Sequence, residues 1–388
     1  LWSGLESLAN QTPLWWPALA LTQVPGNLAI AHLGQLSGPG LVAAAIVASN
    51  SLWAEAVRAG FSPKLSQQNG FIPIGLTGLA IVGISHAIGL GLWSQPLLNQ
   101  PGQALEIGLI QGNIPNDIKF GSEGWRRSLA GYTQGYELLA RQGADAVLLP
   151  ETALPIVWTP DQRGDSPFYQ ALRLQEVPAI VGAFAPDRDR PDRLNNTLIA
   201  TDRNGETIGH YNKTKLVPLG EYIPFEELLG QLIGRLSPLD ATLAAGSPNQ
   251  HLDTSFGRAI AAICYDSAFS EILRRQAASG GELILTAANN AHYRVAMFAQ
   301  HHAQDILRAI ELDRWVVRAT NTGFSAVITP HGETRWRSRP NVYAIHLAHV
   351  QRRTTITPYV RWGDWFTPSL GLVAVALKLA EIRHGDIG

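Results

Sequence analysis

Two long stretches without a charged side chain constrain this 388-residue chain more than any other feature. Residues 7–54 contain no Asp, Glu, Lys or Arg, and neither do residues 65–105. An apolar helix of about 20 residues crosses a bilayer, because its backbone groups are satisfied internally. The sequence therefore predicts a membrane region over 1–103, with spans at about 38–57 and 71–93 preceded by an interfacial or partial span.

A third apolar stretch lies near the other end of the chain, at 365–382. Lys378 is close enough to the end of this stretch for its ammonium to reach the interface. Tryptophan prefers the membrane interface, and the predicted spans are flanked by Trp15, Trp16, Trp53, Trp93, Trp362 and Trp365. The alternative is a buried helical hairpin of a soluble protein. We interpret His86, inside the second span, as packed within the helix bundle.

Basic residues predict the orientation of the spans. The connection 58–70 holds Arg58 and Lys64, whereas 94–104 holds neither Lys nor Arg. Because cytoplasmic loops are enriched in Lys and Arg, the first connection is expected in the cytoplasm and the middle of the chain outside. Residues 353–388 then supply a C-terminal transmembrane helix and a short cytoplasmic tail.

Composition excludes several classes of protein. Lys and Arg number 30 and Asp and Glu 31, so no excess of positive charge favours nucleic acid. One Cys excludes a disulfide framework and a CxxC metal cluster. The first residue is Leu, and no basic segment precedes an apolar run, so we expect the chain to begin inside a longer protein and not at a signal peptide.

Residues 104–352 alternate strand-like and helix-like patterns, which is typical of a layered α/β domain. Short aliphatic segments predict strands at 105–111, 146–151, 179–184, 196–202, 259–265 and 282–287. Helical patterns occupy 123–141 and 297–312, and Asn204-Gly205 predicts a hairpin turn. We therefore expect an α/β domain between the membrane segments.

The common nucleotide-binding and hydrolase motifs are missing from this sequence. It contains no GxGxxG after a strand, no GxxxxGK[ST], no GxSxG and no HExxH. His301 and His302 are adjacent on a predicted helix and so face different directions. We interpret them as packed or solvated, and no metal site is predicted.

Three chemically capable side chains stand at predicted strand ends. Cys264 ends the apolar strand AIAAICY, Glu151 ends VLLPE, and Lys213 follows another strand in YNKTKLVP. Sites of α/β domains form at the carboxyl ends of strands. Taken singly, the Cys is better explained as core filler than as a nucleophile, and the two charges are explained as solvated strand ends.

Together, these segments resemble the Glu-Lys-Cys triad of the nitrilase, or carbon–nitrogen hydrolase, superfamily. Glu151 in LPETALP, Lys213 in YNKTKLVPLGEYIPF and Cys264 in ICYDSAFSE occur in that family's order. With the flanking spans, the chain resembles the membrane-bound branch, the apolipoprotein N-acyltransferases. QGNIP (111–115) and RATNTGFSAVITPHG (318–332) support the likeness, which covers essentially the whole chain.

The resemblance implies a nitrilase-like αββα sandwich, inserted between transmembrane helices, as the extracytoplasmic catalytic domain at 104–352. It implies a multi-pass protein of the bacterial inner membrane, with this domain on the periplasmic face. The activity implied moves a fatty acyl chain from a phospholipid through a Cys264 thioester to the N-terminal amine of a diacylglyceryl-cysteine apolipoprotein, with no cofactor. A membrane-anchored nitrilase-type amidase and a catalytically degenerate relative are the alternatives.

Each triad residue has an intelligible role in acyl transfer. Glu151 would act as general base toward the Cys264 thiol, and Lys213 would stabilise the oxyanion. Lys215 competes with Lys213, because it lies two residues on and shares a strand face; the family motif selects Lys213. The resemblance gives supporting roles to Glu221, in proton positioning or in orienting Lys213, and to Tyr265.

The sequence departs from the family's pattern at three places. Asp266 stands where a Glu is usual, and Phe120 where a Trp often follows QGNIP. The segment 289–293, Asn-Asn-Ala-His-Tyr, stands where Asn-Asp-x-Trp-Phe is expected. These departures leave the triad complete.

A helical segment between Lys213 and Cys264 is amphipathic. Its apolar residues share one face: Leu228, Leu229, Leu232, Ile233 and Leu236. One hypothesis is a lipid-access lid that dips into the outer leaflet. The alternative is that this face packs on the domain.

Overall fold

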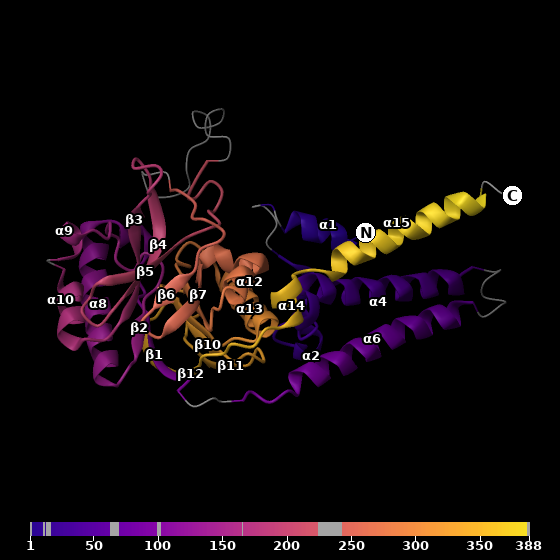
Figure 1. The fold of residues 1–388 in the computed structure, drawn as a ribbon, viewed down its shortest axis with the longest axis horizontal. Helices are drawn as coiled ribbons and strands as arrows, with labels where there is room; N and C mark the ends of the chain where they lie inside the picture. The colour runs from indigo at the N-terminus through magenta and orange to yellow at the C-terminus, as the bar shows by residue number, and fades with distance from the viewer. Residues whose placement is uncertain are drawn as a thin grey trace. The chain divides into compact units, whose positions relative to one another are not determined.

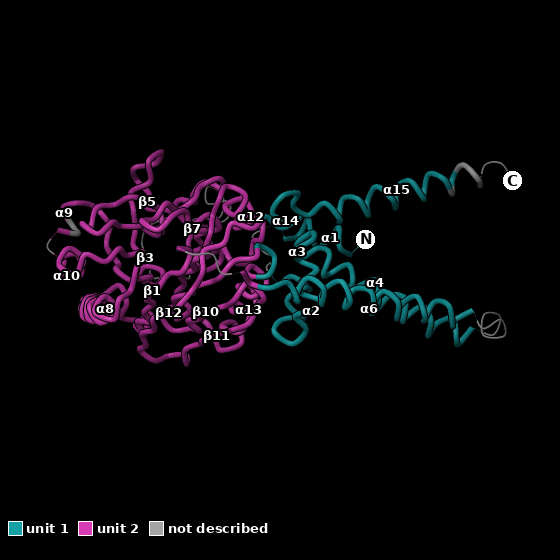
Figure 2. Tube along the Cα trace, turned by 60° about the horizontal axis from the view of Figure 1, so that its bottom comes forward, with its two compact units in different colours: residues 1–96, 310–312, 356–388 teal, residues 97–309, 313–355 magenta. Residues whose placement is uncertain are grey.

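The computed structural model describes residues 2–10, 12, 17–62, 70–98, 102–164, 166–223 and 243–385. They form two compact units: residues 1–96, 310–312 and 356–388, and residues 97–309 and 313–355 (Figure 2). The first unit thus includes residues 310–312, which end the helix predicted at 297–312 within the catalytic domain. The predicted lid residues lie outside the described residues: Leu228, Leu229, Leu232, Ile233 and Leu236.

The first unit consists of helices (Figure 1). They are α1 (Trp2–Ala9), η1 (Leu19–Gln23), α2 (Leu28–Ala31), α3 (Gly34–Ser37), α4 (Pro39–Gly60), α6 (Phe71–Trp93), α14 (Pro358–Trp362) and α15 (Phe366–Gly385). Length and composition would allow α4 and α6 to cross a membrane. The apolar part of α15, Phe366–Ala380, is shorter. The expected partial span before residue 38 is a series of short helices.

His86 is held by polar neighbours within this unit. Its Nδ1 lies 2.9 Å from the Val82 carbonyl oxygen, and its Nε2 lies 3.3 Å from Asn27 Nδ2. A carbonyl accepts only, so Nδ1 donates and Nε2 accepts. This arrangement matches a packed histidine in the helix bundle.

The second unit contains two six-stranded sheets (Figure 1). In spatial order, the first holds β12 (Ala344–Gln351), β1 (Ala104–Gln111), β2 (Ala146–Leu148), β3 (Ala179–Pro186), β4 (Leu194–Thr201) and β5 (Thr207–Asn212). The second holds β11 (Thr334–Arg337), β10 (Ala326–Ile328), β9 (Val316–Thr320), β8 (Leu283–Ala288), β7 (Gly257–Ile263) and β6 (Leu252–Thr254). In each sheet three neighbouring strands are parallel, β1-β2-β3 and β7-β8-β9, and the outer strands run antiparallel.

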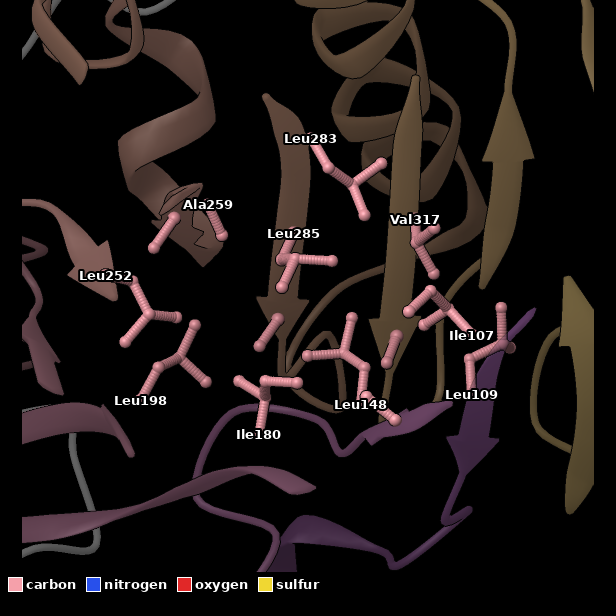
Figure 3. Close-up of a cluster of buried hydrophobic side chains, with 14 of the residues drawn as sticks. Ile107, Leu109, Leu148, Ile180, Leu198, Leu252, Ala259, Leu283, Leu285 and Val317 are labelled. Carbon is pink, nitrogen blue, oxygen red and sulfur yellow. The ribbon is translucent and has the colours of Figure 1, made fainter. Parts of the chain in front are cut away.

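The apolar strands are buried on both faces. Along β1, Ile107 and Leu109 point between the two sheets, whereas Ile110 joins the cluster on the outer face. Figure 3 shows side chains of both sheets meeting in the inner layer, among them Leu148 opposite Leu285 and Val317. Successive side chains point to opposite faces, and because both faces are buried these segments form continuous apolar runs.

Helices cover the outer face of each sheet. α8 (Ser122–Arg141) and α10 (Pro167–Gln175) bury Tyr136, Leu139 and Phe168 against the first sheet. α12 (Ser270–Ala278) is bound to β7 by the Gln276 amide, which bonds both backbone groups of Ala261. α13 (Val295–Leu312) is tied to β9 by the Arg318–Asp305 ion pair. The predicted αββα sandwich is confirmed.

The predicted strands all occur, with shifted ends. The Asn204-Gly205 turn joins β4 to β5, and Gly205 has the positive φ, 82°, that this turn needs. The remaining helices are α7 (Asn116–Lys119), α9 (Pro160–Arg163) and η2 (Cys264–Ala268). Strands β6 and β9 to β12 were not predicted; β9 carries Arg318 inside an otherwise apolar strand, which hides its pattern.

Leu285→Ala tests the inner layer. Leu285 is fully buried between the sheets, so its truncation should cost about 2–5 kcal/mol and lower the unfolding midpoint by roughly 5–15 °C. The measurement is thermal unfolding of the detergent-solubilised chain by circular dichroism. Leu174→Ala is the matched control, because Leu174 is 77% exposed and should change stability by less than about 0.5 kcal/mol. Equal effects of the two substitutions would contradict the sandwich core.

Candidate active site

Three strand ends bring the predicted triad to one cavity. Glu151 follows β2, Lys213 follows β5 and Cys264 follows β7. They line a cavity of about 320 Å³, together with Phe120, Thr152, Phe184, Asn196, Val217, Pro218, Gly220, Glu221, Asn289, His292 and Tyr293. Carboxyl ends of strands from both sheets therefore form the candidate site, as expected of an α/β domain.

Lys213 is a buried cation between two carboxylates. Its Nζ lies 3.0 Å from Glu151 Oε1 and 2.8 Å from Glu221 Oε1, and its side chain is 1% exposed. Burial alone would lower the pKa of Lys213, but Glu151 and Glu221 outweigh it and raise that pKa well above its ordinary value. Lys213 is therefore charged, and Glu221 is in direct contact with it.

The carboxylate of Glu151 is fixed by two further hydrogen bonds. Asn196 Nδ2 donates to its Oε1 at 2.7 Å, and the Asn289 backbone N–H donates to its Oε2 at 2.7 Å. Burial raises the pKa of Glu151, but Lys213, Lys119 and Asn196 more than offset this and hold it below the ordinary value. Glu151 is thus an ionised acceptor at neutral pH.

The turn after Glu151 approaches β3 closely. A Cβ on Gly182 would lie 2.0 Å from the Pro150 carbonyl oxygen, so only glycine fits there. Thr152 has a φ of 43°, in the left-handed region. A non-glycine residue with that φ marks stored backbone strain, and here it directly follows Glu151 at the cavity.

Cys264 begins the short helix η2 with a φ of 51°. Its side chain is buried, and burial with the nearby Glu151 charge raises the pKa of the thiol to about 12, against the opposing effect of Lys213. The resting residue is therefore a neutral thiol. A nucleophile in this state needs a base within the cavity to take its proton.

Asp266, which stands where a Glu is usual, accepts hydrogen bonds from the Cys264 turn and from the lysine loop. Its Oδ1 accepts from the Lys215 backbone N–H at 2.7 Å, and its Oδ2 from the Ile263 N–H at 3.1 Å and the Tyr211 hydroxyl at 3.0 Å. Burial raises its pKa to about 6, although these donors act in the other direction. The carboxylate therefore fastens the Cys264 turn to the lysine loop.

Two other predicted residues point elsewhere. Lys215 Nζ lies 4.8 Å from the centre of the Phe269 ring, and Lys215 is not among the described residues that line the cavity. Of the two lysines, Lys213 is therefore the one that lines the cavity with Glu151 and Cys264. Tyr265 packs edge-on against the same Phe269 ring at 5.0 Å and is also outside the described lining.

Lys119 was missed by the sequence analysis. It ends α7 and is 1% exposed, and its Nζ donates to the Glu151 backbone carbonyl at 3.1 Å. Burial lowers its pKa to about 8, against the attraction of Glu151 and Cys264. The only local signal is its place beside Phe120, one of the noted departures.

Asparagines hold the loops around the cavity, a role that no sequence pattern predicted. The Asn321 side chain donates to the Ile114 carbonyl oxygen at 2.7 Å and accepts from the Ile114 N–H at 2.8 Å. It also donates to Asn289 Oδ1 at 2.9 Å. The two supporting segments, 111–115 and 318–332, thus meet beside the residue that binds Glu151.

The two adjacent histidines on α13 are buried. His301 Nδ1 lies 3.1 Å from Asn290 Oδ1, and His302 Nε2 lies 2.9 Å from the Thr334 hydroxyl. They were interpreted as packed or solvated, and both are packed. In the described part of the chain, no three His, Cys, Asp or Glu side chains come together as a metal site would require.

Lys119→Met tests the buried charge. In the folded state the pKa of Lys119 is lowered to about 8, so the cost of burying its charge is fully present below pH 8. That cost disappears as the pH rises from 8 to 10.5, the ordinary pKa that Lys119 has in the unfolded chain. The variant should be more stable at pH 7, by about 3 kcal/mol at 1.36 kcal/mol per pKa unit, and its advantage should shrink above pH 8. Unfolding midpoints from pH 7 to 10.5 measure this; a constant difference would contradict it.

Comparison with known proteins agrees with this architecture. Residues 106–356 match the carbon–nitrogen hydrolase family. In the C. elegans NitFhit crystal structure, a similar fold covers 67% of this chain and 62% of that one, with a TM-score of 0.50 and 20% identity.

Closer relatives extend over nearly the whole chain. The apolipoprotein N-acyltransferase of a Nostoc species is 52% identical over 375 residues, covering 95% of this chain and 72% of its own length. That of a Synechocystis species is 46% identical over 384 residues, covering 98% of this chain and 73% of its own length. The chain therefore belongs to the carbon–nitrogen hydrolase family and, within it, to the apolipoprotein N-acyltransferases.

Proposed function

We propose that this protein N-acylates lipoproteins by a two-step transfer through Cys264. The acyl donor is a phospholipid, and the acceptor is the N-terminal amine of an S-diacylglyceryl-cysteine apolipoprotein. The observation that carries this is the buried Lys213, which links Glu151 and Glu221 in the cavity that contains Cys264. The names of the relatives supply the acceptor.

In the first step Cys264 becomes acylated. Glu151 takes the proton of the Cys264 thiol, and Sγ attacks the ester carbonyl carbon of the phospholipid. Lys213 stabilises the negative oxygen of the tetrahedral intermediate. The C–O bond then breaks, Glu151 returns its proton to the departing lysophospholipid oxygen, and an acyl thioester remains on Cys264.

In the second step the amine takes the acyl chain. Its nitrogen attacks the thioester carbonyl carbon, and Lys213 again faces the negative oxygen. Glu151 accepts a proton from that nitrogen as the C–N bond forms. The C–S bond breaks, and Glu151 passes the proton to Sγ, which restores the thiol.

A lipid donor requires access to a membrane. In a bacterial inner membrane, α4 and α6 cross the bilayer and the connection 58–70, with Arg58, faces the cytoplasm. The catalytic domain, 104–352, then lies on the periplasmic face, and residues 353–388 return the chain. The apolar cavity wall of Phe120, Phe184, Val217 and Pro218 suits an acyl chain.

Mass spectrometry of the intact protein tests the transfer. After incubation with a phospholipid, the wild type should gain the mass of one acyl group, and a diacylglyceryl-cysteine peptide should remove it. Cys264→Ala should gain nothing, because it has no thiol to acylate.

The way the adduct is lost separates the alternatives. Release by water alone, with no transfer to the peptide, would favour an amidase-like hydrolase. A folded wild type that gains no acyl mass would favour the degenerate relative.

Glu151→Gln separates the two effects of this carboxylate on the thiol. Acyl loading should fall by about 100-fold or more, because the general base is gone. Alkylation of Cys264 by iodoacetamide at pH 8–9 should rise several-fold, because the Glu151 charge helps to raise the thiol pKa. The same mass measurement reports both rates. Glu137→Gln on α8 is the matched control and should change neither rate; an equal fall in both rates for Glu151→Gln would contradict the electrostatic effect.

A further inference from the structure

The proposed second step starts from a neutral amine, so it gives no acceptor for the extra proton of the ammonium form. An N-terminal amine has a pKa near 8, so at neutral pH it arrives mostly as an ammonium ion with three protons. The amide product keeps one of them, and therefore two must leave. Glu151 can carry only one, since that proton ends on Cys264 Sγ.

His292 is placed to take the other proton. It lines the cavity that contains Cys264 and Glu151, and it is also exposed to solvent. Among the described residues, neither of its ring nitrogens has a hydrogen-bond partner, so one is available to accept. An exposed imidazole can then release the proton to water.

The position of His292 is tied to the triad. Three residues earlier, the Asn289 backbone N–H donates to Glu151 Oε2 at 2.7 Å. The His292 ring meets the Tyr293 ring edge-on at 6.3 Å, and Tyr293 meets His301 on α13 at 5.8 Å. The segment that carries the imidazole is therefore anchored at both ends.

The partly buried ring of His292 is neutral at pH 7. Burial lowers the pKa of its ring below the ordinary 6.5, and Lys119 and Lys213 act in the same direction. Glu151 and Glu221 act in the opposite direction and do not overcome burial. A neutral imidazole can accept a proton, whereas an imidazolium cannot.

We infer that His292 is a second general base, which deprotonates the incoming ammonium before the amine attacks the Cys264 thioester. The N–H bond of the ammonium breaks, its proton moves to an imidazole nitrogen, and the freed electron pair forms the C–N bond. This inference rests on the proposed function, because it concerns only that second step.

Single-turnover measurements on the detergent-solubilised chain separate the steps. Loading from a phospholipid is followed first, and discharge by a diacylglyceryl-cysteine peptide is then followed from pH 6.5 to 9.5. His292→Gln should load within twofold of wild type. Its discharge should be about 10–100-fold slower at pH 6.5, and the deficit should vanish above pH 9, where the amine is already neutral. His210→Gln on β5, outside the cavity lining, is the matched control and should behave as wild type.

Other results would overturn the inference. A deficit of the same size at every pH would mean that His292 only shapes the cavity. Equal slowing of loading and discharge would place His292 in both steps, and an unchanged discharge rate would mean that water takes the proton. Normal loading shows that each variant is folded. His292→Gly offers a second readout, because added imidazole should restore its discharge at pH 6.5 if a base is what it lacks.

Discussion

The buried cation of Lys213 is the interaction on which the rest of the candidate site depends. An ammonium with 1% exposure is tolerable only beside compensating charge, and Glu151 and Glu221 lie within 3.0 Å of it. Each carboxylate in turn needs donors: Asn196 and the Asn289 N–H for Glu151, and the Val217 N–H for Glu221. Removing Lys213 would leave two buried carboxylates without the cation they share, so the cluster holds loops from both sheets in a single arrangement.

The sequence predicted those parts of the molecule that repeat or that carry recognisable chemistry. Apolar runs located the central strands, and the triad followed from its order and its flanking motifs. Asn196, Asn321 and Lys119 could not be predicted, because each acts through a bond to a segment far away in the chain and leaves no local pattern. Tyr265, to which the resemblance gives a supporting role, lies outside the described cavity lining and packs against the ring of Phe269.

The departures from the family's pattern touch the charged cluster less than their number suggests. In the segment 289–293, Glu151 is bound by the backbone N–H of Asn289, a position that matches the family's pattern. Asp266 is shorter than the Glu expected there, yet it still reaches the backbone N–H groups of Lys215 and Ile263. The side chains that differ most, His292 and Tyr293, form a wall of the cavity and make none of the contacts that hold Lys213.

The geometry of Glu151 also limits how many protons the site can handle at once. A carboxylate has about four acceptor positions, and Lys213, Asn196 and the Asn289 N–H already occupy three of them. The remaining position suffices for one proton, which in the mechanism proposed above returns to sulfur before the next cycle. A hydrolase that delivers acyl groups to neutral water would need nothing more, because that single proton balances the reaction. An enzyme whose acceptor enters as an ammonium ion has a second proton to dispose of, and in the proposed mechanism Glu151 already carries the first.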